Sequence, residues 1–312
     1  MKILVTGGTG SLGTALVPRL IENGNNVTVL SRDPHKQHAL RLIAPRANFI
    51  LGDVADMRTA MKATKGIEVV VHAAALKHVD IGELSPEEYT RVNVLGSINI
   101  AEACRENGVR QAILISSDKA VEPINLYGKT KAIAEDVFTN SGFNALRYGN
   151  VVSSRGSFLN VWEKALEDKR KIVVRSPSPT RFLLNMNAAI DLIYAVQEGL
   201  TNHSISRGSV CIPSHMSAFS IMDVALMFFR DEEIELKPLL PGEKRHEILL
   251  ANSESVDFVH GAVAQISKYG NEKDRDLYCS NTCHKLVRDE LADALLGVLE
   301  GLPLLKERLS SW

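Results

Sequence analysis

Three glycines spaced three residues apart constrain the fold of this chain more than any other feature. The segment Gly7-Gly8-Thr9-Gly10-Ser11-Leu12-Gly13 follows a short apolar run, Ile3–Thr6, and opens a helical pattern, Ser11–Glu22. Glycine permits the tight turn at position 7, close ligand approach at position 10 and close packing of helix on strand at position 13. The N–H groups at the start of the helix attract an anion. This combination predicts a nucleotide-binding βαβ unit that binds the pyrophosphate of a dinucleotide.

Short apolar runs alternate with helical patterns through the first half of the chain. Parallel strands need crossover connections, so this alternation predicts an α/β protein with a Rossmann-type, doubly wound parallel sheet. The expected strands are Ile3–Thr6, Val27–Leu30, Asn48–Leu51, Val69–His72, Ala112–Ser116 and Ala145–Tyr148. The expected helices are Ser11–Glu22, Arg58–Thr64, Pro86–Asn107 and Leu126–Thr139.

The alternation becomes irregular after Asn150. We expect residues 1–150 to form the cofactor-binding Rossmann domain, with segments returning to it at about 185–213. Residues 151–184 and 214–312 are expected to form a smaller, C-terminal substrate-binding domain. Within this half we expect helices at Asn160–Glu167, Asn187–Gly199, Ser220–Arg230 and Val287–Leu299, a strand at Ser209–Ile212 and a loop at Lys237–Lys244.

Composition excludes several classes of protein. With 312 residues, 45% of them hydrophobic and 23% charged, the chain has the composition of a soluble globular protein. A net charge of −1 argues against a nucleic-acid partner. No apolar run is long enough for a membrane span, and the first residues lack the pattern of a signal peptide, so we expect a cytoplasmic protein. Cys279, Cys283 and His284 lack a second cysteine pair, so we expect no metal site.

Tyr127 and Lys131 lie four residues apart within the predicted helix Leu126–Thr139. Side chains at this spacing share one helix face, with about 6 Å between their roots. A neighbouring ammonium group favours the phenolate, and lowering the pKa of a tyrosine by about 3 units takes roughly 4 kcal/mol. We therefore expect Lys131 to stabilise a Tyr127 phenolate that removes a proton from a sugar or alcohol hydroxyl. The spacing also occurs on solvated helix faces, so the prediction depends on the glycine loop for support.

Asp118 and Lys119 directly follow the predicted strand Ala112–Ser116. The carboxyl ends of strands line the ligand crevice in sheets of this kind, so the pair is expected to face the ligand. It adds an acid and a base that simple dehydrogenation does not need. The alternative interpretation is an ion pair on the protein surface.

The end of the second strand indicates which cofactor is bound. NAD-specific sites place a carboxylate there, but this chain has Ser31 and Arg32, and arginine can hold a 2′-phosphate. The sequence therefore favours NADP over NAD. The residues expected at the cofactor are Gly7, Thr9, Gly10, Ser11, Leu12, Gly13, Ser31, Arg32, Asp53, Val54, Ala73, Ala74, Ala75, Lys77, Asn93, Tyr127, Lys131 and Tyr148.

These motifs resemble the extended short-chain dehydrogenase/reductase superfamily. More narrowly, the chain resembles the inverting UDP-N-acetylglucosamine 4,6-dehydratases of the polysaccharide biosynthesis protein family. The resemblance rests on Gly7–Gly13, Ser31–Asp33, His72–Val79, Ser116–Ala120, Pro123–Gly128, Arg147–Val152, Ser154–Ser157, Thr180–Phe182, Pro241–Lys244 and His246-Glu247. Leu240 stands where that family commonly has arginine, which leaves the identity of the nucleotide carrier open.

The resemblance implies a redox-neutral dehydration of a UDP-linked sugar. Tyr127 and Lys131 would oxidise carbon 4 with bound NADP, Lys119 would act as the base at carbon 5, and Asp118 would protonate the departing 6-hydroxyl. Ser117 would hydrogen-bond the 4-hydroxyl, which completes the expected catalytic residues. The residues expected at the substrate are Lys77, Asn150, Arg155, Arg181, Glu243 and Lys244. The superfamily also implies a homo-oligomer, assembled through Pro86–Asn107 and Leu126–Thr139.

Two other interpretations remain open. The same fold serves nucleotide-sugar 4-epimerases and NADP-dependent reductases. A chain of this kind could also be a catalytically inactive, NADP-binding regulatory protein, although such proteins tend to lose the tyrosine or the lysine.

Overall fold

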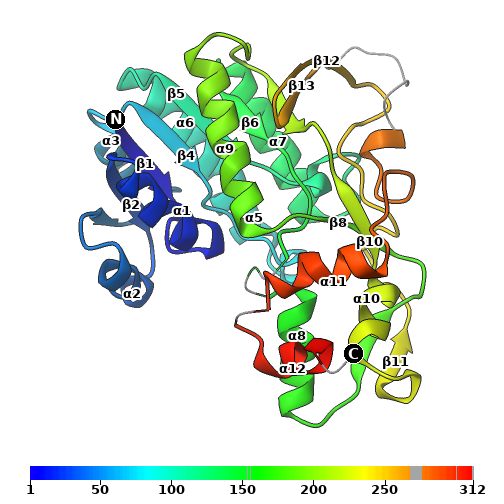
Figure 1. The fold of residues 1–312 in the computed structure, drawn as a ribbon. Coiled ribbons are helices and arrows are strands. Elements are labelled where there is room, and N and C mark those ends of the chain that lie inside the picture. Colours follow the sequence, from blue (N-terminus) through cyan, green and yellow to red (C-terminus); the bar gives the residue numbers. More distant parts are fainter. Residues whose placement is uncertain (153, 155, 268–275, 300, 311–312) are drawn as a thin grey trace.

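A computed structural model describes residues 1–152, 154, 156–267, 276–299 and 301–310. Within these residues the largest sheet has nine strands, in the order β12-β13-β9-β6-β5-β4-β1-β2-β3 (Figure 1). The strands are β1 Lys2–Thr6, β2 Asn26–Ser31, β3 Asn48–Leu51, β4 Val69–His72, β5 Gln111–Ile115, β6 Asn144–Leu146, β9 Val210–Pro213, β12 Ser255–His260 and β13 Val263–Ser267.

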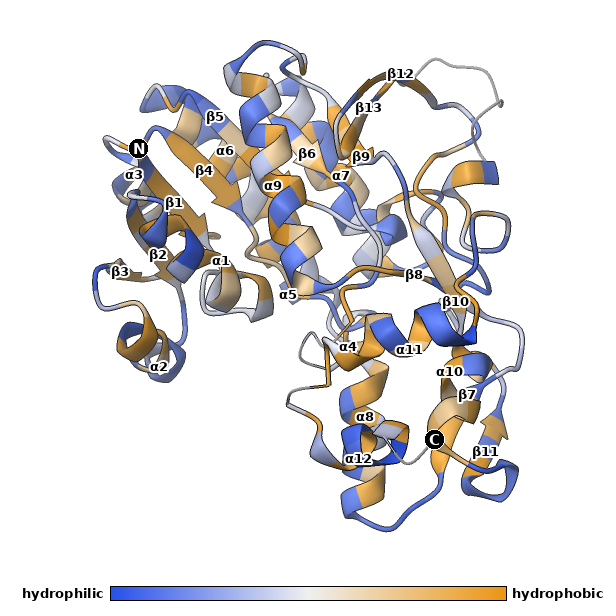
Figure 2. Cartoon of the chain, in the orientation of Figure 1, coloured by the Kyte–Doolittle hydropathy of each residue, from blue (hydrophilic) through white to orange (hydrophobic). Residues whose placement is uncertain are grey.

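All strands from β9 to β3 in this sheet order run parallel to one another, as the sequence predicts. In the register of β1, Leu4 lies opposite Thr28 of β2 and Val70 of β4. Strand β4 is buried along its whole length, and Figure 2 shows hydrophobic colouring along β1 and β4. A strand covered on both faces needs apolar side chains at successive positions, which is the pattern seen in the sequence.

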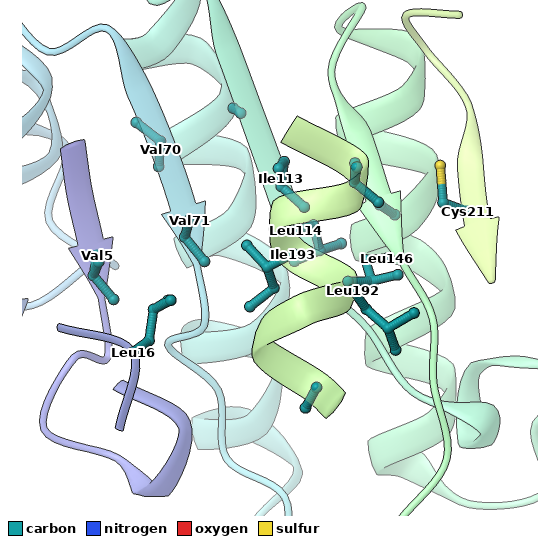
Figure 3. Packing of buried hydrophobic residues seen from close by; sticks show 14 of the residues in the cluster. Val5, Leu16, Val70, Val71, Ile113, Leu114, Leu146, Leu192, Ile193 and Cys211 are labelled. Carbon is teal, nitrogen blue, oxygen red and sulfur yellow. The ribbon is translucent and has the colours of Figure 1, made fainter. Parts of the chain in front are cut away.

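Helices cover both faces of the sheet. On one face lie α1 Ser11–Glu22 and α9 Met186–Thr201, which contact each other. Leu192 and Ile193 of α9 pack over Ile113, Leu114 and Leu146 of the sheet (Figure 3). The other face carries α3 Met57–Thr64, α6 Gly96–Glu106 and α7 Leu126–Asn140. The architecture is the predicted doubly wound α/β fold.

Side-chain caps fix where two of the helices begin. Asn125 Oδ1 accepts a hydrogen bond of 2.7 Å from Gly128 N at the start of α7. Asp33 caps α2, Pro34–Ile43, by accepting one of 3.0 Å from Lys36 N. We did not predict α2, although Asp33 followed by proline is a typical helix start.

The segment predicted as one helix, Pro86–Asn107, is helical but not uniform. It consists of α5 Pro86–Tyr89, a π-helical segment Thr90–Leu95 and α6. A short helix, α4 Val79–Leu84, precedes it and was not predicted. The wider π-helical turns carry Asn93, which is buried. Hydrophobic periodicity does not distinguish the π-helix from the α-helix, because the shift is less than one residue per turn.

A second cluster of buried apolar side chains lies outside the large sheet, around Leu159, Trp162, Phe219 and Leu305. Its elements are α8 Phe158–Glu167, β7 Ile172–Arg175, β8 Thr180–Leu183, β10 Ser217–Ser220, α10 Ile221–Phe228, β11 Ile234–Lys237, α11 Arg288–Leu296 and α12 Pro303–Ser310. Strand β8 pairs antiparallel with β10, and β7 pairs parallel with β11.

One part of the expected smaller domain lies elsewhere in the structure. Strands β12 and β13, within the range 214–312, extend the large sheet through antiparallel pairing of β13 with β9. The backbone N–H and C=O groups along the edge of β9 can pair with a hairpin. A pairing between strands this far apart in sequence cannot be predicted from local sequence patterns. The remaining domain limits stay a prediction.

Candidate active site

The glycine loop brings three segments of backbone close together. Gly7 has a φ of +66°, and a Cβ atom there would lie 2.7 Å from Ala74 Cα. A Cβ atom on Gly13 would lie 2.3 Å from Gly8 Cα. No side chain caps the N-terminus of α1 at Gly10. Only glycine fits this arrangement, which leaves a helix N-terminus and a bare backbone surface suited to a pyrophosphate.

The alanines after β4 lie beside this loop. Ala73 N donates to Thr6 O over 3.2 Å, and Ala74 N donates to Thr6 Oγ1 over 3.3 Å. Asn93 holds Leu76, the residue that follows the three alanines. Its Oδ1 accepts a hydrogen bond of 2.8 Å from Leu76 N, and its Nδ2 donates one of 2.9 Å to Leu76 O. Asn93 was predicted at the cofactor, and in this structure its amide shapes the loop that flanks the glycine turn.

Charged residues gather where β2 and β3 end. Arg32 lies 3.0 Å from Glu88 Oε1 and 3.6 Å from Asp53 Oδ2, and Arg91 lies 2.9 Å from the same Asp53 oxygen. Asp53, predicted at the cofactor, is therefore held by two arginines. Asp33 caps α2 through Oδ1, and its Oδ2 lies 3.1 Å from Lys36 Nζ.

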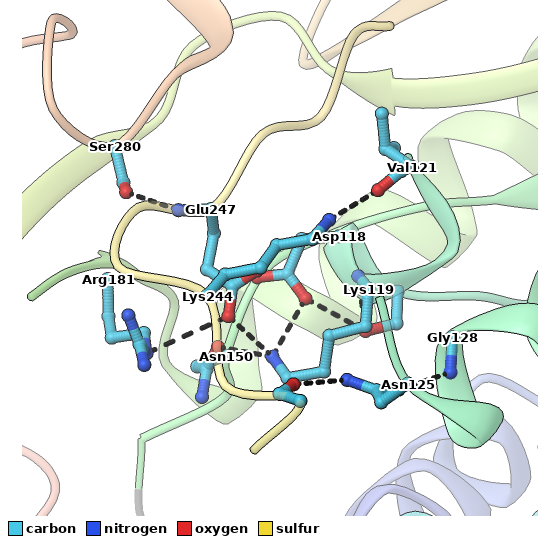
Figure 4. Close-up of polar contacts among 12 residues, drawn as sticks. Asp118, Lys119, Val121, Asn125, Gly128, Asn150, Arg181, Lys244, Glu247 and Ser280 are labelled. Atoms are coloured by element: carbon cyan, nitrogen blue, oxygen red, sulfur yellow. Dashed lines mark hydrogen bonds and ion pairs between the residues drawn. The ribbon is translucent and has the colours of Figure 1, made fainter. Parts of the chain in front are cut away.

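Asp118 and Lys119 lie where the carboxyl ends of β5 and β6 meet. The Lys119 Nζ atom has three acceptors: Asp118 Oδ1 at 3.1 Å, Asn150 Oδ1 at 3.2 Å and Glu247 Oε1 at 3.2 Å (Figure 4). Ser117 Oγ donates to the same Asp118 oxygen over 2.9 Å. Asp118 is completely buried, and its Oδ2 has no hydrogen-bond partner among the described residues. The predicted pair is thus an internal cluster, not an ion pair on the surface.

The electrostatic environment assigns protons within this cluster. Burial raises the pKa of Asp118, and the Glu247 carboxylate raises it further, against the effect of Lys119. Burial acts to lower the pKa of Lys119, but Asp118 and Glu247 together hold it above its ordinary value. Asp118 therefore suits an acid. The neutral Lys119 expected for a base is not the form that the surrounding charges favour.

Tyr127 and Lys131 share one face of α7, as predicted, but the expected effect of the lysine on the tyrosine is not seen. Burial raises the pKa of Tyr127, while the Lys119 ammonium and a hydrogen bond with Ser117 act to lower it. Lys131 donates over 2.5 Å to Ile115 O, and burial lowers its pKa to about 8. The cation that acts to lower the pKa of Tyr127 in this structure is Lys119, while the Lys131 ammonium is bonded to the carbonyl group of Ile115.

The predicted substrate residues lie in different surroundings. Asn150 and Lys244 reach the cluster around Lys119, and Lys244 Nζ donates to Val121 O. Arg181 Nε lies 3.7 Å from Glu247 Oε1, but its Nη1 donates to the backbone oxygens of Thr180 and Arg245.

Two other predicted substrate residues, Glu243 and Lys77, form their hydrogen bonds outside this cluster. Glu243 Oε2 caps its own loop by accepting from Leu240 N at 2.8 Å. Lys77 is exposed, and its Nζ donates to Ser154 Oγ over 3.4 Å. Arg155 lies outside the described residues.

Glu247 is the residue at this site that the sequence did not single out. It belongs to the His246-Glu247 pair that contributed to the family resemblance, yet we gave it no role. Its side chain is 2% exposed and contacts both Lys119 and Arg181. Its position three residues after Lys244, a predicted substrate residue, could have indicated that it lies at the site. Its contact with Lys119 could not be predicted, because the two residues are far apart in sequence.

His72 has a structural environment. Its ring lies 2.6 Å from Thr6 Oγ1 and 3.2 Å from Ser97 Oγ, and it stacks on Phe138 at 5.4 Å. Burial lowers its pKa to about 3, so it stays neutral. His78 is exposed and precedes α4. In the described part of the chain no three His, Cys, Asp or Glu side chains gather as metal ligands, and no helix there could cross a membrane.

Comparison with known proteins identifies the relatives of this chain. Residues 3–267 match a family model described as polysaccharide biosynthesis protein. The inverting UDP-N-acetylglucosamine 4,6-dehydratase of Campylobacter jejuni subsp. jejuni serotype O:2 is 33% identical over 268 residues, which cover 81% of this chain and 78% of the relative. The UDP-glucose 4-epimerase of Rickettsia bellii (strain RML369-C) is 30% identical over 331 aligned positions, covering 95% of each chain.

Solved structures agree with the fold. The X-ray structure of Pen from Bacillus thuringiensis has a TM-score of 0.84 at 27% identity and covers 95% of this chain and 97% of its own. DesIV, a dTDP-glucose 4,6-dehydratase from Streptomyces venezuelae solved with NAD and TYD bound, has a TM-score of 0.73 at 17% identity. That match covers 100% of this chain and 99% of the other, and at this identity it supports the fold alone.

Proposed function

Because the chain belongs to the polysaccharide biosynthesis protein family, we propose that it is a nucleotide-sugar 4,6-dehydratase. Its substrate is UDP-N-acetylglucosamine or a close relative, and carbon 5 is inverted. The observation that carries this proposal is the buried acid, Asp118, paired with Lys119 beside Tyr127. Oxidation and reduction at carbon 4 need the tyrosine, whereas loss of water also needs a proton donor for the departing oxygen.

Residues of the site can perform the steps of the proposed reaction up to the loss of water. A nicotinamide cofactor bound at the glycine loop would accept a hydride from carbon 4 and later donate a hydride to carbon 6. Tyr127 takes the proton of the 4-hydroxyl, which Ser117 hydrogen-bonds, and Lys131 lies on the same helix face one turn away. The resulting ketone acidifies the hydrogen on carbon 5. Lys119 removes that proton once it has lost one of its own, and Asp118 protonates the 6-hydroxyl so that it leaves as water.

We propose NADP as the cofactor. Arg32 lies directly after β2, where a guanidinium can bind a 2′-phosphate, and it pairs there with Glu88 and Asp53. The position of Arg32 favours the phosphorylated cofactor. DesIV was solved with NAD bound, so the choice between the two cofactors has to be measured by titration with each of them.

We also propose a homo-oligomer. Leu95 and Ile98, at the junction of the π-helical segment with α6, and Ile133 of α7 are 42%, 38% and 47% exposed. Apolar side chains of this size on two adjacent helices suit contact with a second copy of the chain. Light scattering of the wild type and of Ile133→Glu tests the proposal, and the variant is expected to be smaller. The expected cytoplasmic location stays a prediction.

A proton NMR experiment in heavy water tests the dehydratase function. The purified protein, loaded with NADP, is incubated with UDP-N-acetylglucosamine. A new 6-methyl signal with deuterium at carbon 5 supports dehydration. The second candidate, a 4-epimerase, is favoured by the Rickettsia relatives and would yield a 4-epimer without a methyl signal. Unchanged sugar beside bound NADP would indicate a regulatory protein.

A further inference from the structure

A buried asparagine connects the start of α7 with a loop from a distant part of the chain. Asn125 is 4% exposed and directly precedes α7, the helix that carries Tyr127. Its Oδ1 accepts a hydrogen bond of 2.7 Å from Gly128 N, and its Nδ2 donates one of 2.8 Å to Gly242 O (Figure 4). One amide group therefore caps the helix and also binds a residue that lies 117 positions away in sequence.

The loop, and not the helix, explains why an asparagine stands at position 125. Serine, aspartate and asparagine cap helices about equally well. Of these three, only asparagine carries a separate amide N–H group beside the oxygen that caps. Its neighbours fix the orientation of the amide, because Gly128 N is a donor and Gly242 O is an acceptor. Turning the amide over would lose both hydrogen bonds.

The bound segment, residues 240–247, contains two of the predicted substrate residues, Glu243 and Lys244, and is called the substrate loop below. Gly242 has a φ of +83°, and a Cβ atom there would lie 3.1 Å from Asn125 Cβ. The backbone of the substrate loop therefore lies directly against the asparagine, and glycine suits this contact because it has no Cβ atom.

The substrate loop also reaches the Asp118–Lys119 pair. Lys244 Nζ donates to the carbonyl oxygen of Val121, the residue that follows the 3₁₀ turn of that pair. Glu247 Oε1 lies 3.2 Å from Lys119 Nζ. The loop therefore contacts the short segment 118–125 near its start, in its middle and at its end, and the contact near its start is the one to Asn125.

We propose that Asn125 positions the substrate loop against the start of α7, so that Lys244 and Glu247 meet Tyr127 at one site. Asn125 acts through the loop and the helix, and it is a positioning residue. That the loop serves a nucleotide sugar rests on the proposed function. When the bond to Gly242 is lost, the loop moves more freely, and part of the binding free energy of the substrate has to be spent on bringing it back.

Asn125→Ser tests the proposal, because serine keeps the cap of α7 but has no amide N–H for Gly242. In hydrogen exchange of the purified protein without substrate, we expect amides of the substrate loop to exchange roughly 3- to 10-fold faster, the effect of one lost hydrogen bond. Exchange in α7 should stay at the wild-type rate. With UDP-N-acetylglucosamine, KM should rise by a similar factor while kcat changes less.

Two matched controls separate the contact from its surroundings. Asn185→Ser changes an exposed asparagine that caps α9 through Ala188 N, and it should leave both the exchange of the substrate loop and KM unchanged. Gly242→Ala and Gly261→Ala both place alanine at a positive φ, of +83° and +57°, but only the Cβ atom at position 242 meets Asn125. Gly242→Ala should therefore loosen the substrate loop as Asn125→Ser does, and Gly261→Ala should not.

The two measurements fail separately. If Asn125→Ser leaves the exchange of the substrate loop unchanged, or speeds exchange in α7 by the same factor, the positioning role of Asn125 is overturned. If the wild type forms the 6-methyl product and Asn125→Ser loosens the loop without raising KM, the role of the loop in substrate binding is overturned. If the wild type forms no such product, the dehydratase function is overturned, and the exchange rates still decide whether Asn125 positions the loop.

Discussion

Arg147 and Glu135 form a two-bond ion pair in the interior of the protein. The Nε–Oε1 distance is 3.1 Å and the Nη2–Oε2 distance is 2.7 Å, and both side chains are at most 6% exposed. Arg147 also holds Glu254, at 2.9 and 3.0 Å. The guanidinium thereby joins α7, which carries Tyr127 and Lys131, to the end of β6 and to the segment that follows Glu247.

Replacement of Arg147 should therefore destabilise the protein strongly. Arg147→Met leaves two buried carboxylates without their cation, and the expected loss is about 3–5 kcal/mol in the free energy of unfolding. Urea denaturation measures it. The control is Arg110→Met, which removes an exposed pair with Glu68 and should change stability by about 1 kcal/mol or less. Equal losses in the two variants would contradict the structural role of Arg147.

Gly13→Ala should damage both folding and cofactor binding. The added Cβ would lie 2.3 Å from Gly8 Cα, so α1 has to move away from the glycine loop. We expect a loss of about 1–3 kcal/mol in stability, together with weaker NADP binding in a fluorescence titration. Gly297→Ala is the control, because a Cβ atom there meets nothing within 4 Å. Normal NADP affinity in Gly13→Ala would show that the loop is not the pyrophosphate site.

Tyr127→Phe should stop turnover without unfolding the protein. The hydroxyl is the proposed acceptor of the 4-hydroxyl proton, and its loss should lower kcat roughly 100- to 10,000-fold. NADP affinity and the melting temperature should change little. Tyr194→Phe, which removes a hydroxyl that accepts a bond from Asn23 on the distant α1 side, should keep full activity. Turnover in Tyr127→Phe at the wild-type rate would exclude the proposed base.

Arg32→Ala should lower the preference for NADP. The guanidinium is expected to contribute about 1.5–3 kcal/mol through bonds to the 2′-phosphate, so the NADP affinity should fall roughly 10- to 100-fold while NAD is unaffected. Calorimetric titration with both cofactors measures the ratio. Arg58→Ala, an exposed arginine on α3, serves as the charge-matched control. A wild type that already binds NAD better would refute the NADP proposal.

His72 should make stability depend on acid pH. Its pKa falls from 6.5 to about 3 on burial, so the folded form stays neutral while the unfolded form takes up a proton below pH 6.5. The stabilisation is complete above 6.5 and is lost as the pH falls towards 3, by about 1.4 kcal/mol per pH unit in that window. Urea denaturation should show this slope in the wild type and a reduced slope in His72→Gln. His38→Gln, at an exposed position, should keep it.

The sequence predicted the fold because the determinants of this fold are local. Glycine spacing, uninterrupted apolar strands and the amphipathic pattern of Ser11–Glu22 each act within a few residues, and the observed β1, α1 and β4 follow them closely. The spacing of Tyr127 and Lys131 also placed both side chains correctly on one helix face, since helix geometry sets that relation.

Tertiary structure alone decided the charges at the site. Whether Lys119 carries a proton depends on Glu247, which lies more than a hundred residues away in sequence and 3.2 Å away in space. Likewise, the Ile115 carbonyl group determines where the Lys131 ammonium points, and the pairing of β13 with β9 brings the end of the chain onto the sheet. Burial and long-range pairing set pKa values and ion pairs, because both depend on which distant segments exclude water from a side chain. Local sequence fixes the type of residue and its helix or strand, and only the folded chain supplies its neighbours.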